Sequence, residues 1–311
     1  MTSSSSERTQ STRHIIMMEP AGFRSNPETF DTNSYQAENP SDVASLGVLA
    51  VKEFRALRDR LVEHGVIVTT WASEPSSPDA LFCNNWVSTH RLDDGSMGMV
   101  LYPMMARNRQ AERRPELLAW LSGRYRTLRD LSDSEKTGKF LESTGSLALD
   151  RVNNRAYCAI SARSDVTLAQ EWCEMMGYEL VAFQTRNHVG KPVYHTDVVM
   201  FIGTSMIGIC ADCIVPEDVS RVLGKLEETH RVMVLSMDQL RAFCGNALEV
   251  RGTRRSGLLP GDLPRERCYL AMSEGAYGAL DPLQKDLIAM YFDGGVITAP
   301  IPTIEKYGGG S

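Results

Sequence analysis

A chain of 311 residues is long enough for one large α/β domain or for two average domains. Apolar residues make up 42% of it and charged residues 23%, which is ordinary for a protein with a substantial core. The formal charge of −6 leaves no basic surplus to neutralise phosphates, and no apolar run approaches the roughly 18–20 residues that cross a bilayer. Neither a nucleic-acid partner nor a membrane partner is therefore predicted.

The N-terminal residues are rich in Ser and Thr and lack the apolar stretch of a secretory signal. We predict a disordered tail over residues 1–14, a single domain over residues 15–311 and a cytoplasmic location. The seven cysteines fit free thiols in a reducing compartment. Cys210-x-x-Cys213 is the one close pair, and without a second such pair or a histidine cluster at zinc spacing it predicts no metal site.

Apolar periodicity and turn residues place strands and helices in alternation along the chain. The segments predicted as strands are 15–18, 66–71, 97–104, 145–149, 156–160, 193–202, 206–213, 232–235, 268–272 and 296–301. The segments predicted as helices are 44–64, 113–122, 166–176, 216–229, 237–243 and 282–291. This alternation indicates the α/β class, but it does not separate a doubly wound sheet from a propeller of repeated β-β-α-β units.

A histidine and an aspartate open the predicted strand at 193–202. A strand places residues i and i+2 on one face, so His195 and Asp197 are expected to point together into whatever that face lines. A carboxylate supports a protonated imidazole, which would suit general acid catalysis. A surface His-x-Asp or a capping contact is the structural alternative.

Several other strings carry a family resemblance, and together they run from Ile15 to Ser311. They are Glu19–Thr29, Pro78–His90, Leu141–Leu147, Ser161–Asp165, Tyr194–Ile202 and Pro302–Gly310. In these strings the chain resembles the guanidino-group modifying enzymes, which include arginine deiminases, dimethylarginine hydrolases and amidinotransferases. The Asn84-Asn85-Trp86 string resembles, more narrowly, the citrulline-hydrolase-like amidinotransferase branch.

The resemblance implies a fold that periodicity alone leaves open. The superfamily has the pentein fold, a five-bladed α/β propeller of pseudo-repeated ββαβ modules around a central active site. No internal sequence repeat establishes this arrangement independently. The expectation is therefore an α/β protein whose site lies on the central axis.

The resemblance also implies roles for particular residues. His195 would be the general acid and base, and Glu142 would orient it and hold a substrate nitrogen. The expected substrate-binding residues are Asp79, Phe82, Asn85, Asp197 and Arg163, the last for the α-carboxylate of an amino acid. Two positions depart from the superfamily pattern: Ser143 follows Glu142 in place of a glycine, and Asn85 stands where a guanidinium-gripping aspartate is usual.

Two neighbouring features are given less weight. The arginine cluster from Arg107 to Arg114 could contribute to binding the α-carboxylate, but a solvated loop is the favoured interpretation. Cys83, which adjoins the asparagine pair, has no cationic sequence neighbour to lower its pKa, so an inert buried thiol is predicted.

The end of the chain resembles the segment that precedes the nucleophilic cysteine of the superfamily. Ile304-Glu305-Lys306 leads into Gly308-Gly309-Gly310-Ser311, and the thiol would follow a few residues later. We therefore expect the nucleophile, and the last strand of the domain, to lie beyond residue 311. An expression linker is the alternative, since such a glycine run is a common scar.

The implied function is hydrolysis of a C–N bond in a ureido or guanidino amino acid through a covalent thiolate intermediate, with no metal and no cofactor. Because a carboxamide offers one acceptor and one donor, Asn85 could complement a ureido group, which favours citrulline over arginine. The acidic residues Asp79, Glu142 and Asp197 favour a guanidinium instead. A dimethylarginine-type hydrolase, an amidinotransferase and a non-catalytic amino-acid-binding protein remain as alternatives, and a homodimer is possible.

Overall fold

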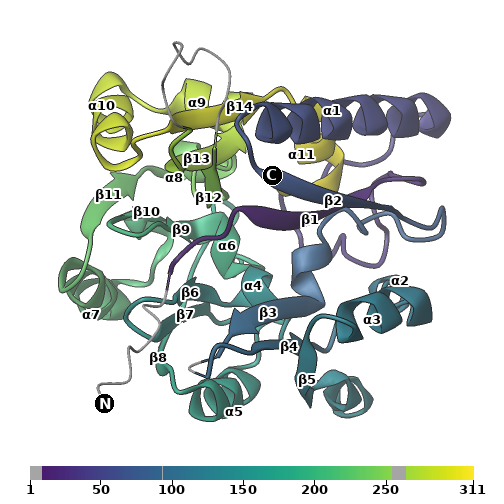
Figure 1. The fold of residues 1–311 in the computed structure, drawn as a ribbon, viewed down its shortest axis with the longest axis horizontal. Coiled ribbons are helices and arrows are strands. Elements are labelled where there is room, and N and C mark those ends of the chain that lie inside the picture. Colours follow the sequence, from purple (N-terminus) through teal and green to yellow (C-terminus); the bar gives the residue numbers. More distant parts are fainter. Residues whose placement is uncertain (1–8, 93, 254–263) are drawn as a thin grey trace.

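The computed structural model describes residues 9–92, 94–253 and 264–311. Within them the strands form five small sheets, one of two strands and four of three strands. Figure 1 shows these sheets distributed around the middle of the molecule, with the longer helices on the outside. The α/β class is confirmed.

Four of the sheets share one arrangement. Their middle strand pairs antiparallel with the strand before it and parallel with the strand after it, and helices cover the parallel connection. Such a crossover is what a parallel pair requires. The strands of these sheets are β3 (Val87–Arg91), β4 (Met97–Leu101) and β5 (Arg126–Asp130); β6 (Ala148–Asp150), β7 (Arg155–Ala159) and β8 (Glu179–Phe183); β9 (Met200–Ile202), β10 (Met206–Cys210) and β11 (Arg231–Leu235); β12 (Leu248–Gly252), β13 (Arg267–Ser273) and β14 (Gly295–Ala299).

The fifth sheet consists of β1 (His14–Glu19) and β2 (Ile67–Ala72), which run parallel and are joined by α1 (Val43–Glu63). β1 thus matches the middle strand of the other sheets. Among the described residues it has no antiparallel neighbour.

The outer helices bury their apolar faces against the sheets and carry their own end signals. α5 (Val166–Met176) begins at Asp165, whose carboxylate accepts from the backbone of Thr167 and Leu168, and ends at Gly177 with a φ of 72°. Caps of these kinds are local, so the bounds of α5 are as predicted from the sequence. The remaining helices are α2 (Arg107–Gln110), α3 (Pro115–Ser122), α4 (Ser143–Ser146), α6 (Thr196–Val199), α7 (Pro216–Glu227), α8 (Met237–Arg241), α9 (Glu274–Ala279), α10 (Pro282–Tyr291) and α11 (Pro302–Gly308), with the 3-10 turns η1 (Cys83–Asn85), η2 (Ser132–Thr137) and η3 (Ala211–Cys213).

Two predicted strands are wrong in a way that matters for the site. The segment predicted as a strand at 193–202 is one extended residue, His195, followed by the helical turn α6 and the short strand β9. The segment at 145–149 begins in the helical turn α4 and becomes a strand only at Ala148. In both places a side chain of the turn, Thr196 or Ser146, bonds backbone groups of distant segments, which periodicity does not reveal.

The N-terminal segment is anchored earlier than expected. Residues 1–8 lie outside the described residues, but Gln10 donates to the carbonyl oxygens of Leu149 and Ile202 at 2.8 and 3.1 Å. The tail predicted over residues 1–14 is therefore fixed from Gln10 onward. No helix among the described residues is long and apolar enough to cross a membrane.

Candidate functional site

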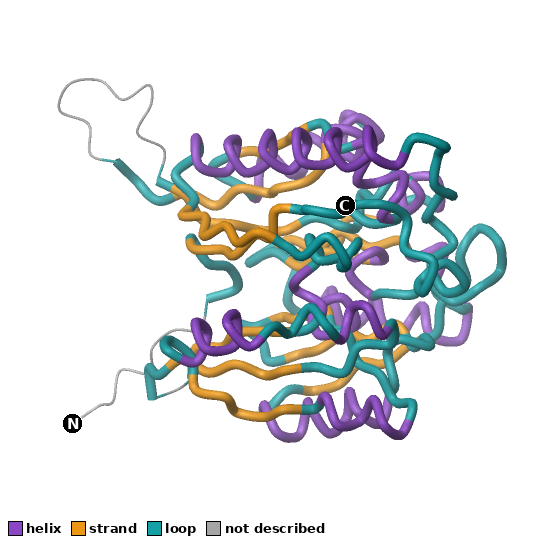
Figure 2. Tube along the Cα trace, turned by 90° about the vertical axis from the view of Figure 1, so that its right-hand side faces the viewer, coloured by secondary structure: helices purple, strands orange, loops and turns teal. Residues whose placement is uncertain are grey.

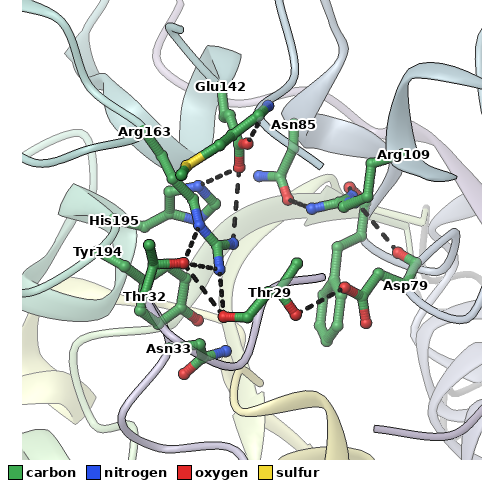
Figure 3. Close-up of polar contacts among 12 residues, drawn as sticks. Thr29, Thr32, Asn33, Asp79, Asn85, Arg109, Glu142, Arg163, Tyr194 and His195 are labelled. Atoms are coloured by element: carbon green, nitrogen blue, oxygen red, sulfur yellow. Dashed lines mark hydrogen bonds and ion pairs between the residues drawn. The ribbon is translucent and has the colours of Figure 1, made fainter. Parts of the chain in front are cut away.

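A cavity of about 470 Å³ lies between the sheets and collects most of the predicted site residues. The predicted residues on its wall are Asp79, Phe82, Asn85, Arg163, His195 and Asp197, and Gly308, Gly310 and Ser311 also line it. Figure 3 shows Asp79, Asn85, Arg163 and His195 from this set, together with Glu142 and Arg109. Residues far apart in the sequence are thus brought to one site.

His195 and Glu142 form the buried centre of the site. His195 Nε2 lies 2.7 Å from Glu142 Oε2, and both side chains are almost fully buried. Glu142 lies behind the imidazole and is not among the residues that line the cavity. Glu142 is thus placed where it could orient His195, whose side chain faces the cavity, and that role stays a prediction from the family resemblance.

The electrostatics separate the two groups. Burial would raise the pKa of Glu142, but Arg163 and the bond to His195 outweigh it and lower that pKa to about 2. Burial lowers the pKa of His195 to about 4, against the opposing effect of Glu142. Near neutral pH the site therefore holds an ionised Glu142 beside a neutral imidazole, which can accept a proton.

Two one-turn helices hold this pair in place. Thr196, the first residue of α6, donates to the carbonyl of Ser146 at 2.6 Å and accepts from the amide of Ala159 at 2.8 Å. A Cβ at Gly145 in α4 would lie 2.4 Å from Asn85 Nδ2 and 2.8 Å from the imidazole, so only glycine allows this approach. Ser143 has a φ of 45°, the left-handed region that explains the glycine usual at this position in the superfamily.

Arg163 supports Glu142 from the other side. Its Nη1 lies 3.8 Å from Glu142 Oε2, and its Nε and Nη2 donate to Thr32 Oγ1 at 2.9 and 2.6 Å. Its guanidinium also stacks over the ring of Tyr194, 4.8 Å from the centroid. These contacts favour a structural partner of Glu142 over the predicted carboxylate-binding role.

Asp79 provides a buried acceptor in the cavity. Its Oδ2 accepts from Asn26 at 2.8 Å, while its Oδ1 has no hydrogen-bond partner among the described residues. Burial raises its pKa despite the nearby arginines Arg109 and Arg163. A buried carboxylate oxygen without a partner is costly, so this position is suited to a ligand that donates. Phe82, from the same loop, lines the cavity beside it.

Asn85 has a fixed orientation because of an arginine that sequence reasoning placed in a solvated loop. Arg109 is almost fully buried and donates to Asn85 Oδ1 at 2.8 Å, to the carbonyl of Phe82 at 2.9 Å and to Glu112 at 3.0 Å. Its guanidinium has only donors, so the amide oxygen of Asn85 must face it. The solvated-loop interpretation is wrong for Arg109. Its charge is compensated by Glu112, and its other donors are satisfied by Asn85 Oδ1 and the carbonyl of Phe82.

The hydrogen bond from Arg109 decides which group Asn85 can offer to a ligand. Its acceptor is taken by Arg109, which leaves the Nδ2 donor toward Gly145 and His195. Asn85 therefore does not present an acceptor and a donor side by side to a ureido group, as the sequence argument supposed. It presents a donor.

Asp197 lies on the opposite side of the imidazole from Glu142. Its Oδ1 is 3.9 Å from His195 Nδ1, and its side chain is 28% exposed. Enclosure in the cavity and the nearby Glu142 raise its pKa to about 8, although Asn84 lowers it. His195 and Asp197 thus meet as expected, but through a helical turn and not along one face of a strand.

The C-terminal segment 308–311 enters the same cavity. Asn33 Nδ2 donates to the carbonyl oxygens of Gly308 and Gly309, and the Tyr194 hydroxyl donates to that of Gly309 at 2.6 Å. Ser311 N donates to Asn246 Oδ1 at 2.6 Å. Sequence reasoning assigned no role to these three side chains or to Glu112, although Tyr194 opens one of the strings that carry the family resemblance.

Cys83 also lines the cavity and is half-buried. Burial and Glu112 raise the pKa of its thiol to about 12. A thiol with so high a pKa is a weak nucleophile at neutral pH, in agreement with the sequence argument. Among the described residues no group of three metal-ligating side chains could hold an ion.

Comparison with known families decides the relationship. The family model described as eukaryotic N,N-dimethylarginine dimethylhydrolase matches residues 19–311. The chain belongs to this family. The guanidino-group modifying superfamily expected from the sequence is confirmed. Within it the matching family is the dimethylarginine hydrolases, one of the alternatives to the citrulline-hydrolase-like branch.

Several solved structures resemble this chain over nearly its whole length. Apo ArgZ, a cyanobacterial arginine dihydrolase, gives a TM-score of 0.69 at 16% identity over 96% of this chain and 39% of ArgZ. Unliganded AgrE gives 0.69 at 18% over 95% of this chain and 37% of AgrE. The chain therefore spans well under half of both proteins.

A third structure matches over nearly its full length. A variant of dimethylarginine dimethylaminohydrolase, as an adduct with S-methyl-L-thiocitrulline, gives a TM-score of 0.59 at 16% identity over 96% of each chain. At these identities the likeness establishes the fold alone, a mixed α/β fold of small sheets. No curated protein sequence matches.

Proposed function

We propose that this protein hydrolyses a guanidino C–N bond of an amino acid, with a cationic guanidinium as the preferred ligand. The observation that carries the proposal is the pair of acidic groups in the cavity. Asp79 has a buried oxygen without a partner, and Asp197 has a pKa raised to about 8. A guanidinium would donate to both and restore the favourable charge balance. The family relationship supports the same chemistry.

The residues divide the reaction among them. The neutral imidazole of His195 takes the proton of an attacking thiol, and the thiolate bonds to the guanidino carbon. The imidazolium, oriented by Glu142, gives its proton to the departing amine as the C–N bond breaks. The imidazole then takes one proton from water, whose oxygen bonds to the carbon and displaces the thiolate. The imidazolium returns that proton to the thiolate, and the second water proton leaves to solvent, where the released amine takes it up, so that a neutral ureido product remains. Asp79 and Asp197 hold the substrate nitrogens during both steps.

The attacking thiol and the final strand are parts of the same proposal. We propose that the five sheets are blades of a five-bladed propeller, and that the polypeptide following Ser311 supplies an antiparallel strand beside β1 and the nucleophilic cysteine. The repeated pairing in the four other sheets supports the strand. The position of Ser311 on the wall of the cavity supports the nucleophile.

A second candidate is hydrolysis of a ureido amino acid such as citrulline. The donor that Asn85 directs toward His195 favours it, because a ureido oxygen accepts such a hydrogen bond and a guanidinium does not. An aspartate at this position would reverse the preference. Asn85→Asp should therefore strengthen the binding of a guanidinium and weaken the binding of citrulline.

Calorimetry on the 311-residue chain tests the choice between a cationic and a neutral ligand. Arginine, N,N-dimethylarginine and citrulline would each be titrated at pH 7 in two buffers with different ionisation enthalpies. A guanidinium bound beside Asp197 lowers the pKa of that carboxyl below its raised value, so binding releases up to one proton and the heat depends on the buffer. Citrulline should bind more weakly and release none.

Asp197→Asn is the control, since it removes the proton release while keeping the shape of the side chain. Buffer-independent binding of a guanidinium, or tighter binding of citrulline, would overturn the proposal. Release of ammonia or dimethylamine by a chain extended to include the proposed cysteine then tests turnover. A full-length protein that binds a guanidinium and releases no amine is the non-catalytic alternative.

A further inference from the structure

The C-terminal segment 308–311 is held by side chains from three separate parts of the chain. Asn33 lies in the loop that follows β1, Tyr194 immediately precedes His195, and Asn246 lies between α8 and β12. Each makes a hydrogen bond to the segment. Asn33 and Tyr194 converge on one oxygen, the carbonyl of Gly309, at 3.3 and 2.6 Å.

The segment is also shaped for this contact. Gly309 has a φ of 68°, and a Cβ there would lie 2.5 Å from Asn33 Nδ2. A Cβ at Gly310 would lie 3.3 Å from the Tyr194 hydroxyl. Because glycine alone accepts both the backbone angle and the close approach at position 309, the side chains and the glycines fit one another.

Two of the three side chains connect the segment to the catalytic centre. The ring of Tyr194 lies 4.6 Å from the ring of His195 and beneath the Arg163 guanidinium. Asn246 accepts from Ser311 N and donates to the carbonyl oxygen of Asp197 at 3.1 Å. The distance from the segment to the imidazole is therefore set by hydrogen bonds whose other ends lie on residues 194–197.

We propose that Asn33, Tyr194 and Asn246 are positioning residues that fix the segment 308–311 relative to His195, and so set the direction from which the chain approaches the reacting carbon. The catalytic part of this inference rests on the proposed function. All three side chains line the cavity, and the role proposed for them is through the geometry of the segment. Their loss should slow the chemical step and leave substrate binding unchanged.

Tyr194→Phe is the sharpest test, because it removes one hydroxyl and keeps the ring that packs on His195 and Arg163. Hydrogen exchange in the 311-residue chain, followed by mass spectrometry of a peptide covering residues 302–311, should become about tenfold faster as the segment opens more often. Tyr157→Phe is the matched control, since Tyr157 is buried in β7 and does not line the cavity. In Tyr157→Phe the exchange rate of the peptide covering residues 302–311 should equal that of the parent chain.

Asn33→Asp is the second variant. It keeps the oxygen that accepts from Tyr35 N at 3.1 Å and replaces the donor that holds Gly308 and Gly309. It should therefore accelerate exchange in the same peptide while leaving the loop folded. Unchanged exchange in both variants would overturn the inference.

Kinetics of a chain extended to include the proposed nucleophilic cysteine separate the two proposals. Tyr194→Phe should lower kcat about tenfold with KM unchanged. An equal kcat in variant and parent overturns the positioning role while the proposed function stands. If the parent releases no amine, the proposed function fails, and the exchange experiment still decides whether the three side chains hold the segment.

Discussion

At the scale of single residues, the site depends on which partners compensate each buried charge. Glu142 is ionised although it is almost fully buried, because Arg163 and His195 both favour its charged form. Arg109 is buried because Glu112 and Asn85 accept from it. The chemistry expected of His195 follows from these pairings, since a neutral imidazole beside an ionised carboxylate is ready to take a proton.

Glu142→Gln should lower the free energy of unfolding by about 3 kcal/mol at pH 7, because it leaves the Arg163 guanidinium buried without its carboxylate. Chemical denaturation measures the loss. Asp238→Asn, at the exposed pair with Arg241 in α8, is the control and should change stability by less than about 0.5 kcal/mol. A similar loss in both variants would contradict the buried pairing.

The pH dependence of this difference has a definite sign. The pKa of Glu142 is depressed from 4.5 to about 2 in the folded protein, so its contribution is complete above pH 4.5 and is lost as the pH falls toward 2. The stability gap between the parent and Glu142→Gln should narrow over that interval. A gap that stays constant from pH 5 to pH 3 would show that Glu142 has an ordinary pKa.

At the scale of elements, short helical turns place the catalytic groups. α4 and α6 are four residues each, too short to be stable alone. They are bonded to each other through Thr196 and Ser146, and further bonds join α6 to Ala159 of β7 and α4 to the carbonyl of Arg163. Gly145 lets α4 approach Asn85 and His195 so closely that no room is left for a methyl group at this position. Longer elements such as α5 and α10 have their caps in their own sequence and were predicted with correct bounds.

Gly145→Ala should weaken guanidinium binding at least tenfold, because the added methyl displaces Asn85 and the imidazole. Calorimetry measures the affinity, and thermal unfolding checks that the variant folds. Gly224→Ala in α7 is the matched control: open space surrounds its Cβ, so it should leave binding unchanged and stabilise the helix by about 0.5–1 kcal/mol. Equal affinities for all three proteins would rule out the tight packing around Gly145.

At the scale of the whole molecule, the N-terminal strap, residues 10–13, ties several sheets together at one end of the cavity. Gln10 contacts the ends of β6 and β9, Arg251 of β12 donates to the carbonyl of Thr12, and Ile67 of β2 donates to that of Arg13. Figure 2 shows helices along the upper and lower sides of the molecule, with strands between them. Sheets that share few contacts gain cooperativity from such a strap.

Gln10→Ala should lower the free energy of unfolding by about 2 kcal/mol, since the Gln10 amide also accepts from Arg151 N at 2.9 Å and three hydrogen bonds are lost. Denaturant titration provides the measurement. Gln170→Ala on the exposed face of α5 removes one solvated contact and should be nearly neutral. If the two variants are equally stable, residues 10–13 do not contribute to holding the sheets.

The sequence by itself determined the α/β class, the helices with local caps, the superfamily and six of the residues that line the cavity, because apolar periodicity, capping residues and catalytic strings are encoded within a few positions of one another. Tertiary structure alone decided that residues 193–202 contain a helical turn, that Arg109 is buried, and that Asn85 presents its donor. These outcomes depend on hydrogen-bond partners that lie far away in the sequence. Thr196 turns where Ser146 and Ala159 hold it, and the amide of Asn85 faces as Arg109 requires.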